Sequence, residues 1–398
     1  MSQQFDVIVI GLGAFGSSAV GELAARGVRV LGIEQFTPAH ALGSSHGETR
    51  IIRKAYFEHP DYVPLLHESY RLWSELETWS GESLYQETGL VLSGPGEGET
   101  VRGAIHAATL HNLRCDVLTA DRAGQRFPTF QFPEHHTVLF EEQAGYLRVE
   151  QCVSTQLARA EALGADLRFG ELVRSWSIDG NSQVRVQTDK DHYSAERLIV
   201  TAGAWSDRLL HESLANIPPC RSSSEVTASA FPTLRVVRKV QCWNRVEPIH
   251  RAALQAMPVY YFETAAGAFY GFPSLDGKSV KVAQHNRTEH DTIVSDPNLL
   301  DRELHHRDTV SIGNFVTQHL RGVGQEAIRH AVCMYTMTPD EHFLIDRHPC
   351  YGQVTFAAGF SGHGFKFAPV IGTALADLSL TGRSSLPVEF LSLSRFVD

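Results

Sequence analysis

The chain opens with a short apolar run, Phe5–Ile10, which is interrupted only by Asp6 and runs directly into glycines. A second apolar run, Val28–Ile33, follows after one intervening segment. Short apolar runs bounded by turn signals are typical of buried strands. Two such strands joined through a glycine turn and a helix form a βαβ unit. The first residues, to roughly Glu34, therefore predict a βαβ unit.

Helical periodicity follows in the segment 61–78, where apolar side chains fall near one stripe. Such a stripe predicts a helix that packs on a core. Residues 150–163 and 368–380 also predict helices. Further apolar runs predict strands at residues 89–94, 165–169, 197–205 and 354–358.

The middle of the chain, residues 235–285, alternates polar with apolar and aromatic positions. This pattern predicts an antiparallel sheet in a second domain. The fold class we predict is α/β, with a Rossmann-type nucleotide domain that is discontinuous in sequence. We assign residues 1–88, 150–216 and 325–398 to the nucleotide domain, and 89–149 and 217–324 to the substrate domain. Residues 221–231 predict a polar surface loop or a mobile insertion.

Gly11, Gly13 and Gly16 have the GxGxxG spacing of a dinucleotide site. The first glycine permits a tight turn, the second lets the backbone approach a pyrophosphate, and the third lets helix and strand pack closely. Glu34, at the end of the second strand, is placed to accept hydrogen bonds from a ribose diol. This carboxylate disfavours a phosphorylated ribose, so FAD or NAD is expected rather than NADP.

Charge and composition exclude several classes of partner. The formal net charge is -10, with no Lys/Arg-rich block, so neither nucleic acid nor an anionic membrane is expected as a partner. No apolar stretch has the length of a membrane span, and the first strand leaves no room for a signal peptide, so we expect a cytoplasmic protein. The six cysteines are scattered, which predicts neither a disulfide framework nor a metal site.

Four longer motifs point to one family: residues 43–53, residues 270–273, residues 333–336 with 339–341, and residues 359–367. In these motifs the chain resembles the FAD-dependent amine oxidases of the monomeric sarcosine oxidase type, which include N-methyltryptophan oxidase and L-pipecolate oxidase. The motifs occur in family order and span nearly the whole chain. Glu48 departs from the pattern, which has Asp there, and the 221–231 loop is longer than the family pattern.

The resemblance implies FAD held covalently, through a thioether between a flavin methyl group and Cys333. It implies further cofactor contacts from residues in the glycine turns and the 43–53 motif. These positions are Gly11, Gly13, Gly16, Glu34, Ser45, Thr49, Gly203, Gly362, Gly364 and Lys366.

The resemblance also places Arg53 and Lys366 around a substrate carboxylate. Both lie among apolar neighbours, and a buried charge demands an anion. Arg50 is expected against the flavin and, three residues before Arg53, on the same face of a short helical turn. Glu58 is the expected partner of one of these arginines or an exposed carboxylate.

Lys281 and His285 lie on one face of a predicted strand, because side chains alternate along it. By resemblance, Lys281 promotes the reaction with oxygen and His285 lies near the substrate amine. His363, in the last glycine turn, is expected to help stabilise negative charge on the reduced flavin. Tyr270 and Tyr261 are expected to form aromatic walls, and Tyr261 to tune substrate choice.

The function implied is the oxidation of a secondary amino acid such as sarcosine, with O2 as oxidant, H2O2 as product and hydrolysis of the imine. L-pipecolate, or a bulkier secondary amino acid, is the alternative substrate. A NAD-dependent dehydrogenase and a non-catalytic flavoprotein are the alternatives from other classes. We expect a monomer or a weak homo-oligomer.

Overall fold

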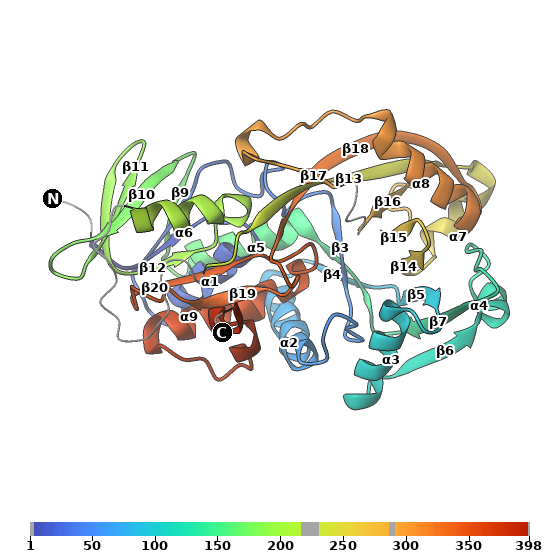
Figure 1. Ribbon diagram of the computed structural model, residues 1–398, viewed down its shortest axis with the longest axis horizontal. Helices are drawn as coiled ribbons and strands as arrows, with labels where there is room; N and C mark the ends of the chain where they lie inside the picture. Colours follow the sequence, from blue (N-terminus) through green and yellow to red (C-terminus); the bar gives the residue numbers. More distant parts are fainter. Residues whose placement is uncertain (1–3, 216–230, 286–290, 397–398) are drawn as a thin grey trace.

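The computed structural model describes residues 4–215, 231–285 and 291–396. Its elements form two large sheets, one mainly parallel and flanked by helices and one mainly antiparallel, which occupy opposite ends of an elongated molecule (Figure 1). This arrangement confirms the predicted α/β class with a Rossmann-type unit. Among the described residues, no helix combines the length and apolar character that crossing a bilayer requires.

The mainly parallel sheet is built on the N-terminal strand. β1 (Gln4–Ile10) pairs in parallel with β2 (Val30–Glu34) on one side and with β12 (His192–Val200) on the other. Both β1 neighbours therefore end at the same edge, where the glycine turn lies. The remaining strands of this sheet are β9 (Asp166–Phe169), β10 (Val173–Ile178), β11 (Val184–Thr188), β19 (Leu344–Arg347) and β20 (Val354–Ala358).

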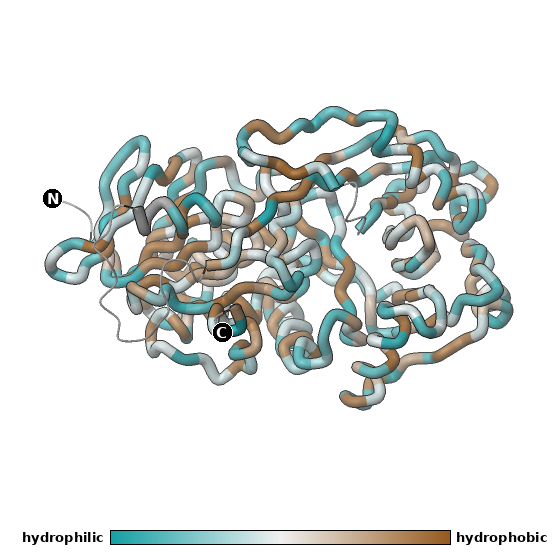
Figure 2. The backbone as a smooth tube through the Cα atoms, viewed as in Figure 1, coloured by the Kyte–Doolittle hydropathy of each residue, from teal (hydrophilic) through white to brown (hydrophobic). Residues whose placement is uncertain are grey.

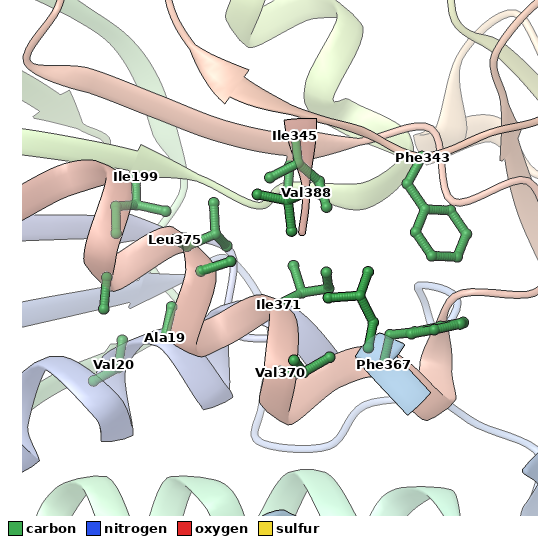
Figure 3. Packing of buried hydrophobic residues seen from close by; sticks show 14 of the residues in the cluster. Ala19, Val20, Ile199, Phe343, Ile345, Phe367, Val370, Ile371, Leu375 and Val388 are labelled. Carbon is green, nitrogen blue, oxygen red and sulfur yellow. The ribbon is translucent and has the colours of Figure 1, made fainter. Parts of the chain in front are cut away.

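Helices cover this sheet with apolar side chains, and the buried strands beneath them form the brown interior of that half (Figure 2). In Figure 3, Leu375 of α9 lies near Ala19 of α1 and Ile199 of β12, and Ile371 lies further along α9 in the same cluster. Burial of each Ile or Leu side chain in this cluster contributes about 1.5–3 kcal/mol to stability. The helices of this half are α1 (Ala14–Ala25), α2 (Tyr62–Ser80), α5 (Val149–Ala162), α6 (Ser206–Ala215) and α9 (Ala368–Thr381).

The second sheet confirms the antiparallel prediction for the middle of the chain. β13 (Arg235–Val246) lies between β16 (Ser279–Gln284) and β18 (Val323–Met337), antiparallel to both. Its other strands are β5 (Leu90–Pro95), β6 (Cys115–Thr119), β7 (His136–Glu141), β14 (Val259–Thr264), β15 (Gly267–Gly271) and β17 (Thr292–Ile293). Its helices are α3 (Glu99–Leu110), α4 (Ala120–Arg126), α7 (Arg251–Gln255) and α8 (His306–His319).

One local prediction was wrong. The segment that holds Arg50 is a strand, β3 (Thr49–Ile52), and not a helical turn. Its β-branched residues favour extended backbone, and it pairs with β8 (Gly145–Arg148), which also pairs with β4 (Tyr85–Glu87).

The predicted loop at 221–231 lies outside the described residues except for Phe231, which is buried. The domain boundaries stay a prediction.

Candidate active site

The glycine turn forms a cradle that larger residues would fill. Gly11 has a φ of +88°, and a Cβ on it would lie 2.6 Å from the carbonyl oxygen of Thr201. A Cβ on Gly16 would overlap the carbonyl oxygen of Gly11. The N-terminus of α1 therefore meets the ends of β1 and β12 closely, which presents helix amides to an anion.

Glu34 lies at the edge of the same cradle. Its Oε2 accepts a hydrogen bond of 2.9 Å from the amide of Leu12, and its Oε1 one of 3.1 Å from the amide of Phe36. These bonds fix the carboxylate at the wall of the cavity described next. This is the position in which a ribose diol would be recognised in a Rossmann-type site.

A long cavity of about 1340 Å³, counted out to its opening, runs from the glycine turn to β18. Its wall combines apolar side chains with glycines and Glu34. This combination fits a dinucleotide that carries a flat ring system. Gly16, Thr49 and Lys366 lie outside this lining. The expected cofactor residues that do line it are Gly11, Gly13, Glu34, Ser45, Gly203, Cys333, Gly362 and Gly364, together with Arg50.

Cys333 lies at the far end of this cavity, on β18. The thiol is buried, and its Sγ lies 3.6 Å from Nη2 of Arg50 and 3.7 Å from the carbonyl oxygen of Ser44. Arg50 itself donates to the carbonyl oxygens of Ser44 and Thr49 at 2.9 Å. The structure therefore brings the predicted tether and the predicted flavin-facing arginine together at one wall.

A second cavity of about 500 Å³ adjoins the first, and Arg50, Gly362 and Phe365 line both. Its volume is in the range of small-molecule sites. It brings together most of the residues predicted to act on the substrate. These are Arg50, Arg53, Tyr261, Tyr270, His285, His363 and Lys366. Tyr261 and Tyr270 both line this cavity, and the part of Tyr261 in substrate choice stays a prediction.

Arg53 is paired inside this cavity with Glu58, the partner that the sequence suggested. Nη2 of Arg53 lies 2.8 and 2.6 Å from the two carboxylate oxygens, and Nη1 donates to the carbonyl oxygen of Ala55 at 2.6 Å. The guanidinium also lies 4.3 Å from the ring centres of Tyr56 and Phe57. Burial opposes ionisation of Glu58, but the neighbouring basic groups, Arg53 foremost with His363 and Lys366, outweigh it and lower the pKa of Glu58 to about 2.

Lys366 faces the same cavity with fewer partners. Its Nζ donates to the carbonyl oxygen of His363 at 2.6 Å and to the hydroxyl of Tyr56 at 3.4 Å. Burial and the nearby Arg53 lower the pKa of Lys366 to about 7, against an opposing effect of Glu58. The two cations share one carboxylate, Glu58, so this end of the cavity is suited to a second anion.

The two histidines of the cavity are neutral at pH 7. Burial lowers the pKa of His285 to about 3 and that of His363 to about 4. Nδ1 of His285 lies 3.1 Å from the hydroxyl of Tyr335, and Nδ1 of His363 lies 2.6 Å from the hydroxyl of Tyr56. We assigned no role to either tyrosine from the sequence, although Tyr335 lies inside the motif that begins at Cys333 and Tyr56 lies three residues after the 43–53 motif.

Lys281 lies behind Thr49 and lines neither cavity. Its Nζ donates to the carbonyl oxygens of Gly47 and Thr49 at 2.5 and 2.8 Å, and to Oγ1 of Thr49 at 3.2 Å. Burial, reinforced by Arg50, lowers the pKa of Lys281, whereas Glu150 and Glu48 oppose that change.

Comparison with known proteins places the chain in one family. The family model for FAD dependent oxidoreductases matches residues 6–378. Monomeric sarcosine oxidase of Streptomyces avermitilis is 39% identical over 397 residues, which cover 98% of this chain and 97% of that protein. Peroxisomal sarcosine oxidase of Homo sapiens is 32% identical, with coverage of 98% and 96%. N-methyl-L-tryptophan oxidase of Yersinia pestis is also 32% identical, with coverage of 98% and 99%.

Solved structures agree on the fold. NikD, described as an unusual amino acid oxidase essential for nikkomycin biosynthesis, superposes with a TM-score of 0.82 at 22% identity and covers 98% of each chain. Glycine oxidase of Geobacillus kaustophilus gives 0.79 at 19% identity and covers 99% of each. The family match decides between the two dinucleotides that the sequence left open, in favour of FAD. The chain belongs to the FAD dependent oxidoreductases and resembles the sarcosine oxidases along nearly its whole length.

Proposed function

We propose that the protein oxidises a secondary amino acid, sarcosine or another N-methyl amino acid, at the C–H bond next to nitrogen. One observation carries the proposal: Arg53 and Lys366, two buried cations, face a small aromatic-walled cavity that adjoins the dinucleotide cavity. A carboxylate at this end of the cavity would be held by charge-assisted hydrogen bonds.

When bound, FAD supplies the acceptor for a hydride equivalent and a route for the electrons to O2, which becomes H2O2. The chain provides the binding and the electrostatics. Arg53 and Lys366 orient the carboxylate, while Tyr261 and Tyr270 exclude water from the reacting end. The same two cations favour the neutral, reactive form of the substrate amine, because a second positive charge beside them is unfavourable. The imine product then hydrolyses in water.

We assign the remaining residues by their positions. His285 is neutral and lines the substrate cavity, so it would contact the amine without adding a charge. His363 and the N-terminal end of α9 would stabilise negative charge that develops on the cofactor. Lys281, held by three acceptors in the 47–49 turn, would stabilise negative charge that develops as oxygen is reduced.

The covalent link to Cys333 is part of this proposal. Its support is the thiol's place in the wall of the large cavity, beside Arg50. Acid precipitation of the native protein would then leave flavin colour in the pellet, whereas Cys333→Ser would release it to the supernatant. Cys152→Ser, which changes a buried thiol of α5 outside the cavity lining, should behave like the native protein. Colour released from the native protein would exclude the thioether.

We carry over from the sequence a cytoplasmic protein that acts on small molecules without a nucleic acid or membrane partner. A monomer or a weak homo-oligomer is expected, and size-exclusion chromatography with light scattering tests this.

The activity is tested by oxygen uptake with sarcosine, L-pipecolate, L-proline and N-methyltryptophan. We expect sarcosine or another N-methyl amino acid to consume oxygen and yield one H2O2 per substrate, independently of added NAD. Uptake with L-pipecolate alone would move the substrate to the cyclic class. No uptake with any member of the panel would contradict the proposal.

A further inference from the structure

Glu48 has a backbone conformation that its residue type seldom adopts. Its φ is +68°, in the left-handed region, and the preceding Gly47 has a φ of +88°. Left-handed backbone is ordinary for glycine but uncommon for a long side chain. Such strain persists only where the surroundings fix it, and it concentrates at functional sites. The contacts that fix Glu48 therefore indicate its role.

The carboxylate of Glu48 is anchored to two strands of the antiparallel sheet. Its Oε2 accepts a hydrogen bond of 2.9 Å from the indole Nε1 of Trp243 on β13, and its Oε1 lies 2.6 Å from Nη2 of Arg329 on β18. The Arg329 guanidinium also lies 4.1 Å from the centre of the Trp243 ring. Trp243 and Arg329 are direct partners in the β13–β18 register, so the two anchors stand side by side.

The backbone around Glu48 is held as firmly. The amides of Gly47 and Glu48 both donate to the carboxylate of Glu150, at 2.7 and 3.1 Å. The amide of Val149 donates to the carbonyl oxygen of Glu48 at 2.9 Å. The 47–49 turn is therefore fixed from the α5 side through its backbone and from the sheet side through one side chain.

This turn places three hydrogen-bond acceptors around Nζ of Lys281. With Glu48 left-handed, the carbonyl oxygens of its two neighbours, Gly47 and Thr49, both accept from Lys281 Nζ, and Thr49 Oγ1 is the third acceptor. An ammonium group has three donors, and three acceptors match its charged form. Trp243 also pairs directly with Lys281 in the sheet, so the anchor of Glu48 and the lysine are neighbours.

We propose that Glu48 is a positioning residue that, by anchoring the 47–49 turn to Trp243 and Arg329, fixes the carbonyl acceptors that hold Lys281 for the reaction with oxygen. This rests on the role of Lys281 in the proposed function. The charged or titratable groups around Lys281 include Glu48, Glu150 and Cys333, which favour its charge, Arg50, which opposes it, and the buried His46.

The longer side chain of Glu48, at a position where the family pattern has Asp, allows its carboxylate to contact both Trp243 and Arg329. A side chain shorter by one carbon–carbon bond withdraws the carboxylate by about 1.5 Å. It would lose contact with Trp243 or Arg329 unless the turn moved. Glu48→Asp therefore tests the anchor while it keeps the charge.

The decisive measurement separates the two half-reactions of the FAD-loaded enzyme in a stopped-flow instrument. The enzyme is reduced chemically with dithionite and mixed with oxygen, and in a separate experiment it is reduced anaerobically by substrate. We expect Glu48→Ala to slow reoxidation by about tenfold or more, and reduction by less than about twofold. Glu48→Asp and Trp243→Phe, which removes the indole donor and part of the aromatic ring beside Arg329, should fall between Glu48→Ala and the native enzyme.

Two control variants remove the same kinds of contact, an indole hydrogen bond and an arginine–glutamate pair, away from Glu48. Trp176→Phe removes another buried indole donor, whose partner is the carbonyl oxygen of Leu209 in the other half of the molecule. Arg245→Gln breaks a surface pair with Glu326 on the same two strands that carry Trp243 and Arg329. Both should reoxidise at the native rate within about twofold.

A readout independent of activity is hydrogen exchange of the segment 44–53 in the FAD-loaded protein. We expect Glu48→Ala to accelerate exchange of the 47–49 amides, and the two control variants to leave it unchanged. Unchanged reoxidation in Glu48→Ala, or an equal slowing of both half-reactions, would overturn the proposal. Because dithionite replaces the substrate, a failure to find a secondary amino acid that reduces the native enzyme would refute the proposed function without deciding the role of Glu48.

Discussion

The two halves of the molecule differ in how their sites are assembled. In the cofactor half backbone geometry dominates, because Gly11 and Gly16 leave room for a tight turn against Thr201 and Glu34 ends the next strand. The substrate half, by which we mean the lining of the second cavity, is assembled from side chains of distant segments, some of which, Arg53 and Lys366 among them, belong to the predicted nucleotide domain. Arg53 follows β3, His285 follows β16, and Lys366 precedes α9. Backbone geometry therefore limits which residues the cofactor half can have, whereas buried charge limits which residues the substrate half can have.

The halves also differ in electrostatics. The substrate cavity is lined by Arg50, Arg53 and Lys366 but by one carboxylate, Glu58, whereas the cofactor cavity is lined by Glu34 and Glu171 together with Arg50 and Arg208. Substitutions in the cofactor half should therefore act by filling the space that the glycine turn leaves open or by changing the turn geometry. In the substrate half they should act through charge.

The largest effect is expected for Gly16→Ala. The added methyl group would overlap the carbonyl oxygen of Gly11, so α1 cannot pack against the turn that holds the pyrophosphate. We expect the purified variant to lack flavin, measured as the ratio of flavin to protein absorbance. The control is Gly21→Ala in the same helix, where a Cβ meets ordinary contacts at 3.7 Å or more. It should keep its flavin and gain about 0.5–1 kcal/mol of stability. Full flavin content in Gly16→Ala would contradict the claim that backbone geometry constrains the cofactor half.

The second effect is expected for Lys281→Met, which keeps the length of the side chain and removes its charge. Reoxidation by oxygen should slow by about 100-fold or more, while reduction by substrate changes little, because the charge matters only when oxygen takes up electrons. Stopped-flow absorbance follows each step separately. Unchanged reoxidation would remove Lys281 from the oxygen reaction.

Lys366→Met should weaken substrate binding. Loss of one charge-assisted hydrogen bond costs about 1.5–3 kcal/mol, which corresponds to a rise in KM of about 10–150-fold. Because the pKa of Lys366 is about 7, the native residue is charged below that pH and loses its proton above it. The ratio of native to variant kcat/KM should therefore be largest below pH 7 and fall as the pH rises through 7. A ratio that does not vary with pH would show that Lys366 does not bind the carboxylate as a cation.

The smallest effect is expected for Glu58→Gln, and its sign is the informative part. Glu58 is ionised at all pH values well above 2 and occupies the fork of Arg53. Its neutralisation frees that fork for the substrate, so KM should fall by about 3–10-fold while the protein loses stability. Glu68→Gln, which breaks a surface pair with Arg71, should change neither quantity. A rise in KM would mean that Glu58 assists binding.

The same contrast explains what the sequence could predict. The strands, helices and glycine cradle around Gly11 follow from local patterns, and the structure confirms them. The contact of Arg53 with Glu58 was one of two options, because only folding shows which carboxylate reaches which cation. Tyr56 and Tyr335 carry no sequence signal of their own, since their hydrogen bonds to histidines join residues far apart in the chain. The helical turn assumed for Arg50 failed because pairing with β8 decides that segment.

The central claim is that a secondary amino acid is bound beside FAD through its carboxylate and is oxidised there. Anaerobic mixing of the native enzyme with sarcosine, L-pipecolate, L-proline and N-methyltryptophan tests it most directly, each alongside the same compound without its carboxylate. We predict rapid bleaching of the flavin by sarcosine or another N-methyl amino acid, and slow bleaching by its carboxylate-free analogue. Bleaching by none of the four, or equal bleaching with and without the carboxylate, would contradict the claim.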